Sequence, residues 1–237
     1  MGLNESKGNM YDWVTHTWNA VKGACPHDCD YCYMKRWGNL NPVRLDEKEL
    51  RTNLGIGNFI FVGSSCDLFA EGIKHGWVAD TLIHCSMYPD NRYLFQTKNP
   101  QLMYDFRQII PKGSALCVTI ETNRNYVQMG RTPTPMDRAN WLGVLAESFD
   151  TYVTIEPVMD FDLEELVELV KQCRPKQVNI GADSGGNKLP EPDGEKLQEL
   201  IYELGKFTTV KPKKNLKRLL PVIGYIEYPE DFRHEEQ

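Results

Sequence analysis

Short apolar segments recur along the chain and alternate with amphipathic ones. Five of them are rich in Val, Ile, Phe and Tyr and are apolar at successive positions, which is typical of strands buried on both faces of a parallel sheet. These predicted strands span residues 58–63, 92–96, 115–120, 151–155 and 177–181. A first strand is predicted near residues 14–21.

Helical patterns occupy much of the chain between the predicted strands. In residues 162–173, Leu163, Leu166, Val167 and Val170 repeat at intervals of three and four, which places them on one face of a helix. Pro, Asp or Asn at the start of such segments and Gly or Pro behind them supply start and stop signals. The predicted helices span residues 46–54, 100–110, 137–149, 162–173 and 193–204.

Alternating strands and helices predict an α/β fold of βαβ units with a parallel sheet. Six such units favour a partial (β/α)6 barrel in a single domain over a closed eightfold barrel, and a doubly wound sheet is the alternative. We expect the barrel to span residues 1–206. Residues 207–237 combine a basic segment, an apolar strand-like segment (219–226) and a charged end, and they are expected to form a C-terminal extension packed on the barrel.

Composition narrows the classes of protein. The chain has 237 residues, 41% of them hydrophobic, and a formal net charge of -6. An acidic chain does not coat nucleic acid by its overall charge, although a local basic patch remains compatible with binding. No segment of about 18 apolar residues is present, so no membrane span is predicted. The polar residues 1–10 lack a signal-peptide pattern, and a cytoplasmic location is expected.

Three of the seven cysteines, Cys25, Cys29 and Cys32, fall within eight positions. Thiolates at this spacing can converge on one metal centre. Structural zinc sites and ferredoxin clusters use four protein ligands, whereas three thiolates leave one iron of a 4Fe–4S cluster free for an outside ligand. The alternative is a zinc site completed by His16 or His27.

The CxxxCxxC spacing, with Tyr31 before the last cysteine and βα units behind it, resembles the radical S-adenosylmethionine superfamily. This resemblance implies a 4Fe–4S cluster on the three cysteines and S-adenosylmethionine bound at the open iron. It also implies a one-electron reductant, flavodoxin or ferredoxin, whose electron cleaves the cofactor to a 5′-deoxyadenosyl radical that abstracts hydrogen from a substrate.

Polar residues follow the predicted strands, where parallel βα folds bind ligands. Acidic residues recur at four consecutive strand ends: Asp67, Glu121, Glu156 and Asp183. They suit a cofactor that carries a sulfonium and an amino group. The resemblance implies specific contacts of S-adenosylmethionine: Ser64, Ser65 and Asp67 with its amino group, Lys98 with its carboxylate, Glu121 or Asn123 with its ribose, and Tyr31 near its adenine.

Two further resemblances bear on the substrate. The segments FVGSSCDLF, FQTKNP, IEP and GADSG resemble a phage- and prophage-associated family of radical-SAM-like proteins. The loops after the second and third strands also resemble those of the spore photoproduct lyases, which repair thymine dimers in DNA. The likeness to the spore photoproduct lyases favours a nucleic-acid base or nucleotide as substrate, in a modification or repair reaction, whereas the phage-associated family has no assigned activity.

Several residues are candidates for contact with that substrate. Cys66 follows the second strand and is a candidate hydrogen-atom donor, the alternative being a small buried side chain. The loop 122–135 carries Arg124, Tyr126 and Arg131, which together with Asp183 are candidate substrate-binding residues. Cationic and aromatic side chains that suit nucleic acid are Lys211, Lys213, Lys214, Lys217, Arg218, Tyr33, Arg36 and Trp37.

The sequence therefore predicts a radical S-adenosylmethionine enzyme that abstracts hydrogen from a nucleic-acid base or nucleotide. Two alternatives remain open. One keeps the radical chemistry but acts on a peptide or small metabolite, and the other is a non-catalytic, zinc-stabilised nucleic-acid-binding protein.

Overall fold

A curved sheet organises the part of the chain that this computed structural model describes, residues 2–7 and 11–220. Within these residues, eight strands pair in the order β1-β2-β5-β6-β7-β8-β9-β10. The edge strand β1 (Asn4–Glu5) runs antiparallel to its neighbour, and all other pairs in this sheet are parallel. The parallel strands are β2 (His16–Trp18), β5 (Phe59–Val62), β6 (Arg92–Thr97), β7 (Ala115–Thr119), β8 (Asp150–Ile155), β9 (Gln177–Ile180) and β10 (Thr209–Pro212).

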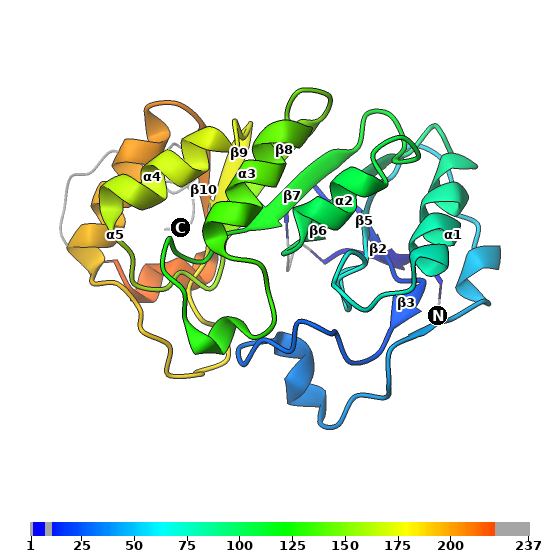
Figure 1. Ribbon diagram of the computed structural model, residues 1–237, viewed down its shortest axis with the longest axis horizontal. Helices are drawn as coiled ribbons and strands as arrows, with labels where there is room; N and C mark the ends of the chain where they lie inside the picture. The colour runs from blue at the N-terminus through cyan, green and yellow to red at the C-terminus, as the bar shows by residue number, and fades with distance from the viewer. Residues whose placement is uncertain (1, 8–10, 221–237) are drawn as a thin grey trace, which may run out of the picture.

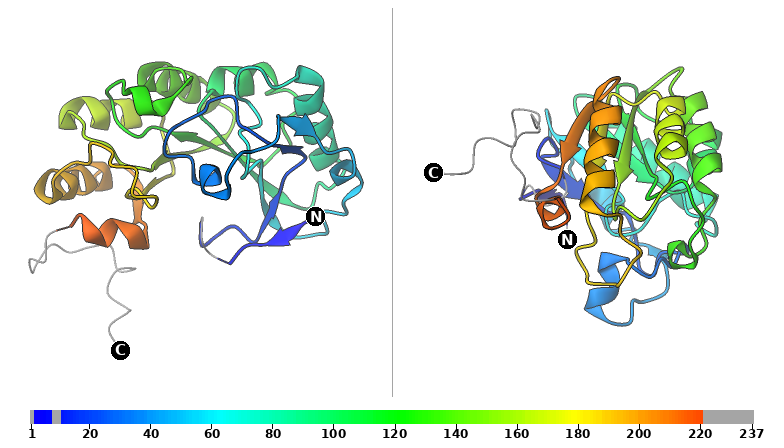
Figure 2. Two further views of the ribbon diagram at one scale, coloured as in Figure 1. Left: turned by 90° about the horizontal axis from the view of Figure 1, so that it is seen from below. Right: turned by 90° about the vertical axis from the view of Figure 1, so that its left-hand side faces the viewer.

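Five helices follow β5 to β9 in turn and lie along the outer side of the curved sheet (Figures 1 and 2). Strand order in the sheet equals chain order, so successive units turn in one direction, unlike the reversing order of a doubly wound sheet. Edge strands β1 and β10 do not pair with each other, which leaves the barrel open and confirms the predicted partial barrel. The helices are α1 (His75–Ser86), α2 (Pro100–Asp105), α3 (Pro135–Leu145), α4 (Leu163–Gln172) and α5 (Gly194–Gly205).

The two faces of the sheet bury different partners. Alternate residues such as Ile60 and Val118 face outward and join the main core with the helices. Their neighbours face the barrel interior, where Phe61 packs in a second cluster with Tyr11 and its neighbour Val14. The chain before β2 therefore fills part of the interior.

Three elements differ from the expectations. Residues 46–54 form only a 3₁₀ turn, η2 (Glu49–Arg51), in which the Glu49 side chain accepts hydrogen bonds from Lys22 and Thr52. Helix α1 was not predicted, since its sequence starts His-Gly-Trp and its apolar residues face both the core (Val78) and solvent (Ile83). The third is β10.

Strand β10 lies within the expected C-terminal extension but continues the barrel sheet beside β9. The sequence of β10 lacks the apolar run that predicts a buried strand, because Val210 is the single deeply buried residue among the four. Of the strand expected at 219–226, Leu219 and Leu220 follow η4 (Lys214–Arg218) outside any strand, and residues 221–226 lie outside the described part of the chain. In the described ranges, no helix is long and apolar enough to cross a membrane.

Candidate functional site

A cavity of about 600 Å³ opens at the carboxyl ends of the parallel strands. The loop that carries Cys25, Cys29 and Cys32 lies across this end of the barrel and continues into η1 (Tyr33–Trp37) (Figure 2). All three cysteines line the cavity. The opposite wall comes from the strand ends and includes Ser64, Ser65, Cys66, Asp67, Gln96, Lys98, Thr119, Glu156, Asp183, Ser184 and Lys213.

The three thiols have different surroundings. Cys29 is buried, whereas Cys25 and Cys32 are half-buried. Cys66 donates a hydrogen bond to Cys25 and lowers the pKa of the Cys25 thiol to about 6. Burial raises the pKa of Cys29, while the nearby Lys98 ammonium, whose Nζ lies 3.7 Å from Cys29 Sγ, acts in the opposite direction. The cavity thus has a cation beside one thiol and a thiol donor beside another.

Loop 122–135 holds the cysteine loop through backbone hydrogen bonds. Arg131 N donates to His27 O at 2.7 Å, and Asp30 N donates to Gln128 O at 2.9 Å. Gly130 has φ of 68°, and a Cβ there would lie 2.2 Å from His27 O, so a side chain does not fit. The predicted substrate loop therefore contributes its backbone to the position of the cysteines.

His27 and Asp67 join the cysteine loop to the strand ends. His27 Nε2 lies 2.9 Å from Asp67 Oδ2, and its Nδ1 lies 3.1 Å from Arg131 O. With both ring nitrogens engaged, His27 is not placed to complete a zinc site. His16, on β2, contacts Thr15 and does not line the cavity.

Asp67 gives its oxygens to protein donors. Besides His27, Oδ2 accepts hydrogen bonds from Thr97 Oγ1 at 3.0 Å and Lys98 N at 2.8 Å, and Oδ1 accepts one from Phe69 N at 2.9 Å. Burial opposes ionisation, but the charge and hydrogen bond of His27, with the two backbone amides, lower the pKa of Asp67. Asp67 thus links three chain segments around the cavity.

A fully buried ion pair lies behind the cysteines. Glu121 Oε2 accepts a hydrogen bond from Arg138 Nη1 at 2.6 Å, and both side chains are excluded from solvent. Glu121 Oε1 accepts from the Tyr31 hydroxyl and lies 3.3 Å from Lys98 Nζ. Although burial opposes ionisation, the charges of Arg138 and Lys98 hold the pKa of Glu121 at about 2.

This cluster changes the expected roles of Tyr31 and Glu121. Burial and the Glu121 charge raise the pKa of Tyr31, so its hydroxyl stays a hydrogen-bond donor. The Lys98 ammonium lies 4.9 Å from the centre of the Tyr31 ring. The two cations Arg138 and Lys98 share the single negative charge of Glu121, which leaves a net positive charge next to Cys29.

The other strand ends make a polar wall. Ser64 Oγ accepts from Asn19 Nδ2 at 3.1 Å, and Ser65 N donates to Asn19 Oδ1 at 2.9 Å. Farther round the barrel, Glu156 pairs with Lys213. Asp183 instead accepts hydrogen bonds from Gly185 and Asn187 and so fixes its own turn.

Four predicted residues of loop 122–135 do not line this cavity. Arg124 makes a two-pronged contact with Asp162, with Nε and Nη2 at 2.8 and 2.6 Å from its oxygens, and Asn123 also bonds to Asp162. The Tyr126 hydroxyl accepts a hydrogen bond from Arg124, and the Arg131 side chain is exposed. Asn123 and Arg124 fix loop 122–135 to the start of α4, whereas Tyr126 also packs against the apolar cluster that contains Cys29 and Tyr31.

Arg138 is the main site residue that sequence reasoning missed. Its one sequence signal is that it shares a helical face with Leu142 and Leu145, which are buried in the core. An arginine on an apolar face needs a buried partner, and Glu121 was not recognisable as that partner from the sequence.

The three thiols fit a 4Fe–4S cluster by their chemistry. In the described part of the chain, no three His, Cys, Asp or Glu side chains converge closely enough to hold a single ion. In such a cluster each thiolate binds a different iron, so its ligands are spread around it. Three cysteines around one cavity would suit that arrangement.

The fold resembles that of spore photoproduct lyase. One mutant of that enzyme matches with a TM-score of 0.63 and 12% identity, over 90% of this chain and 78% of the other. Another mutant, with bound AdoMet and dinucleoside spore photoproduct, matches with a TM-score of 0.57 and 11% identity, over 86% and 64%. At this identity the likeness shows a common fold. No model of a known protein family and no curated protein matches the chain.

Replacement of Arg138 by Met tests the buried ion pair. Glu121 then keeps a charge in the core without its main partner, and we expect a loss of about 3–5 kcal/mol in the free energy of unfolding, measured in urea. Adding Glu121→Gln should restore part of the loss. The exposed Arg92→Met is the control and should cost below about 1 kcal/mol. Equal losses for the two arginines would contradict this role.

The pair of His27 and Asp67 predicts a pH-dependent contribution to stability. Burial lowers the pKa of His27, but the Asp67 charge outweighs it and the pKa is raised. The pair should stabilise most between about pH 4 and about pH 6.5, the ordinary pKa values of the two groups. The contribution is lost at lower pH as Asp67 is protonated, and at higher pH as His27 loses its proton.

The measurement compares metal-free wild type with metal-free Asp67→Asn by urea unfolding across this pH range. The free energy of unfolding of the variant should fall furthest below that of wild type between about pH 4 and about pH 6.5. A deficit that stays constant with pH would show that the pair is not ionised in the folded protein.

Proposed function

We propose that this protein is a radical S-adenosylmethionine enzyme that acts on a nucleic-acid base or nucleotide, in a modification or repair reaction. The observation that carries the proposal is the position of Cys25, Cys29 and Cys32, which line one cavity at the carboxyl ends of an open parallel barrel. The fold supports it, because spore photoproduct lyase shares the fold and has been seen with bound AdoMet and dinucleoside spore photoproduct.

The three cysteines would hold the cluster through their thiolates. When bound, the cluster passes one electron from a flavodoxin or ferredoxin to S-adenosylmethionine, which is cleaved to methionine and a 5′-deoxyadenosyl radical that abstracts hydrogen from the substrate. The low pKa of Cys25 favours the thiolate that a cluster requires.

Residues around the cavity would then bind and orient the cofactor. Lys98 carries the excess positive charge beside Cys29, so its ammonium is the group best suited to the methionine carboxylate. Ser64 and Ser65 lie on the neighbouring strand end and suit the amino group. We propose that Asp67 and Glu121 act by positioning, since their oxygens already bind the protein.

The far wall would face the substrate. Glu156 holds Lys213 at the cavity, and Asp183 shapes the turn that presents Ser184. We propose that Glu156 serves the cofactor or substrate through Lys213, and that Asn123, Arg124, Tyr126 and Arg131 keep the cysteine loop in place from outside the cavity.

Single replacements of the cysteines test the proposal. The anaerobically reconstituted wild type should bind iron and sulfide and release 5′-deoxyadenosine when S-adenosylmethionine and dithionite are added. Cys25→Ala, Cys29→Ala and Cys32→Ala should each lose the iron and the product, whereas Cys85→Ala, a change on the buried face of α1, should keep both. A colourless wild type that binds one zinc ion and forms no 5′-deoxyadenosine would refute the proposal.

Cys66 is a candidate hydrogen-atom donor to the substrate radical. The Cys66 thiol contacts Cys25 and lines the cavity, so its loss could disturb the metal centre. The Cys66→Ala variant is therefore assayed only after its iron content has been shown to match that of wild type. We then expect continued cleavage of S-adenosylmethionine with a lower yield of substrate product. Cys173→Ala, buried between α3 and α4, is the control. An unchanged product yield and cofactor consumption in Cys66→Ala would exclude the donor role.

A further inference from the structure

Helix η1 is an uncovered element at the mouth of the cavity. None of its residues is buried, and Trp37 is 73% exposed although it lines the same cavity as the cysteines. The turn is nevertheless fixed: the Tyr33 hydroxyl donates to Ser64 O at 2.7 Å, and Lys35 pairs with Asp28 at 2.8 Å. An indole held in solvent on a fixed support is a surface on which another flat ring can stack.

Cations accompany these aromatic rings. The Arg36 guanidinium lies 5.6 Å from the centre of the Tyr33 ring. On another side of the same cavity, Lys213 lines the wall and leads directly into η4, where Lys214 and Lys217 are exposed. Figure 2 shows η1 and η4 at the same end of the barrel. These cations stand out in a chain whose formal net charge is -6.

Aromatic stacking surfaces next to exposed cations are the features with which proteins bind single-stranded nucleic acids. A base that reacts inside a protein cavity must leave its stack, and its neighbours then lose a stacking partner. Trp37 offers such a neighbour an aromatic face at the rim, while η4 offers charge to the phosphates that continue past the cavity.

We propose, as an extension of the function proposed above, that a single-stranded nucleic acid lies across the cavity mouth. Trp37 stacks on the base that flanks the reacting one, and Lys214 and Lys217 contact the backbone phosphates beyond it. DNA and RNA share this chemistry, so oligonucleotides of each kind and a duplex of the same sequence distinguish the sources.

The test measures the fluorescence anisotropy of labelled oligonucleotides with the reconstituted full-length protein, without dithionite or S-adenosylmethionine. Trp37→Ala should weaken single-strand binding roughly 5- to 100-fold, the range expected for loss of one stacked base, and Trp37→Phe should retain most of the affinity. The control is Tyr202→Ala, an exposed aromatic residue on α5 that also has a cation, Lys206, over its ring.

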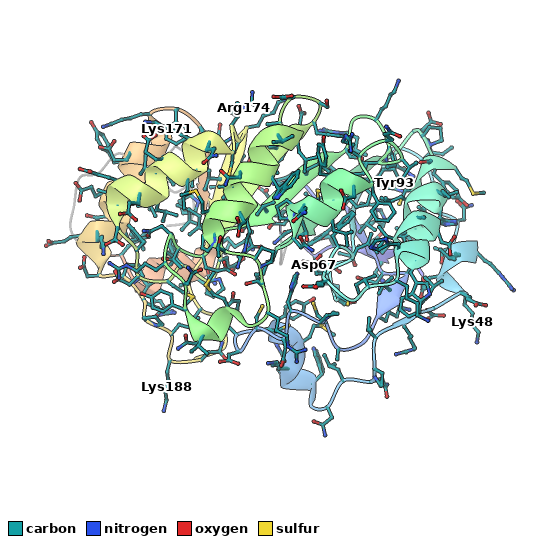
Figure 3. All side chains as sticks on the ribbon, viewed as in Figure 1. Lys48, Asp67, Tyr93, Lys171, Arg174 and Lys188 are labelled. Carbon is teal, nitrogen blue, oxygen red and sulfur yellow. The ribbon has the colours of Figure 1, made fainter. Side chains whose placement is uncertain are left out.

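Salt dependence tests the lysines separately. Affinity for nucleic acid falls as the salt concentration rises, with a negative slope of log affinity against log salt. The double variant Lys214→Ala/Lys217→Ala should make this slope shallower by about 1.4, because each single-strand phosphate contact contributes roughly 0.7. Lys171→Ala/Lys176→Ala removes the same charge elsewhere and should leave the slope unchanged. Figure 3 shows Lys171 far from Asp67, which lies at the cavity.

The outcomes separate this proposal from the radical chemistry. Unchanged affinity in Trp37→Ala, equal slopes in the two lysine variants, or tighter binding of the duplex than of either single strand would overturn the stacking proposal, even if 5′-deoxyadenosine still forms. Conversely, single-strand binding that depends on Trp37 in a protein that never forms 5′-deoxyadenosine would support the stacking surface and refute the enzyme.

Discussion

The site depends on a carboxylate that has no access to water. Glu121 stays ionised only because Arg138 and Lys98 lie on either side of it, and an ion buried without such partners would cost several kcal/mol. Arg138 in turn bonds to the backbone of β7 at Thr119, so the pair ties α3 to the sheet. Through Lys98 and Tyr31, the same carboxylate reaches the cysteine loop. The position of the thiols therefore follows from a charge balance in the core.

Asp67 performs a related task closer to solvent. It joins His27 of the cysteine loop to the backbone after β6, while loop 122–135 supports the other side of His27. We propose that positioning and binding are thus divided between different residues at the strand ends. Asp67 and Glu121 give their oxygens to protein donors, and Lys98, Ser64, Ser65 and the three thiols line the cavity.

Local patterns in the sequence predict the features that depend on local interactions. The cysteine spacing indicates one metal centre, and the apolar segments predict β5 to β9 because each strand is buried as a unit. The interactions that could not be predicted from the sequence join distant parts of the chain. Arg138 depends on Glu121 as its partner. Asn123 and Arg124 bond to Asp162 and do not face the cavity. Strand β10 was missed for the same reason, since pairing with β9 compensates for its polar composition.

The segment before β2 has a consequence for how the protein assembles. Tyr11 packs against Phe61 of β5, and Trp13 lies 5.3 Å from the ring of Tyr152 on β8. The residues that fill the interior leave the ribosome before their partners, which lie much later in the chain. Because contacts between distant parts of a chain form slowly, these aromatic rings stay exposed until most of the sheet exists. Closure of the barrel interior is therefore a late event, and early chains carry an apolar segment that chaperones can recognise.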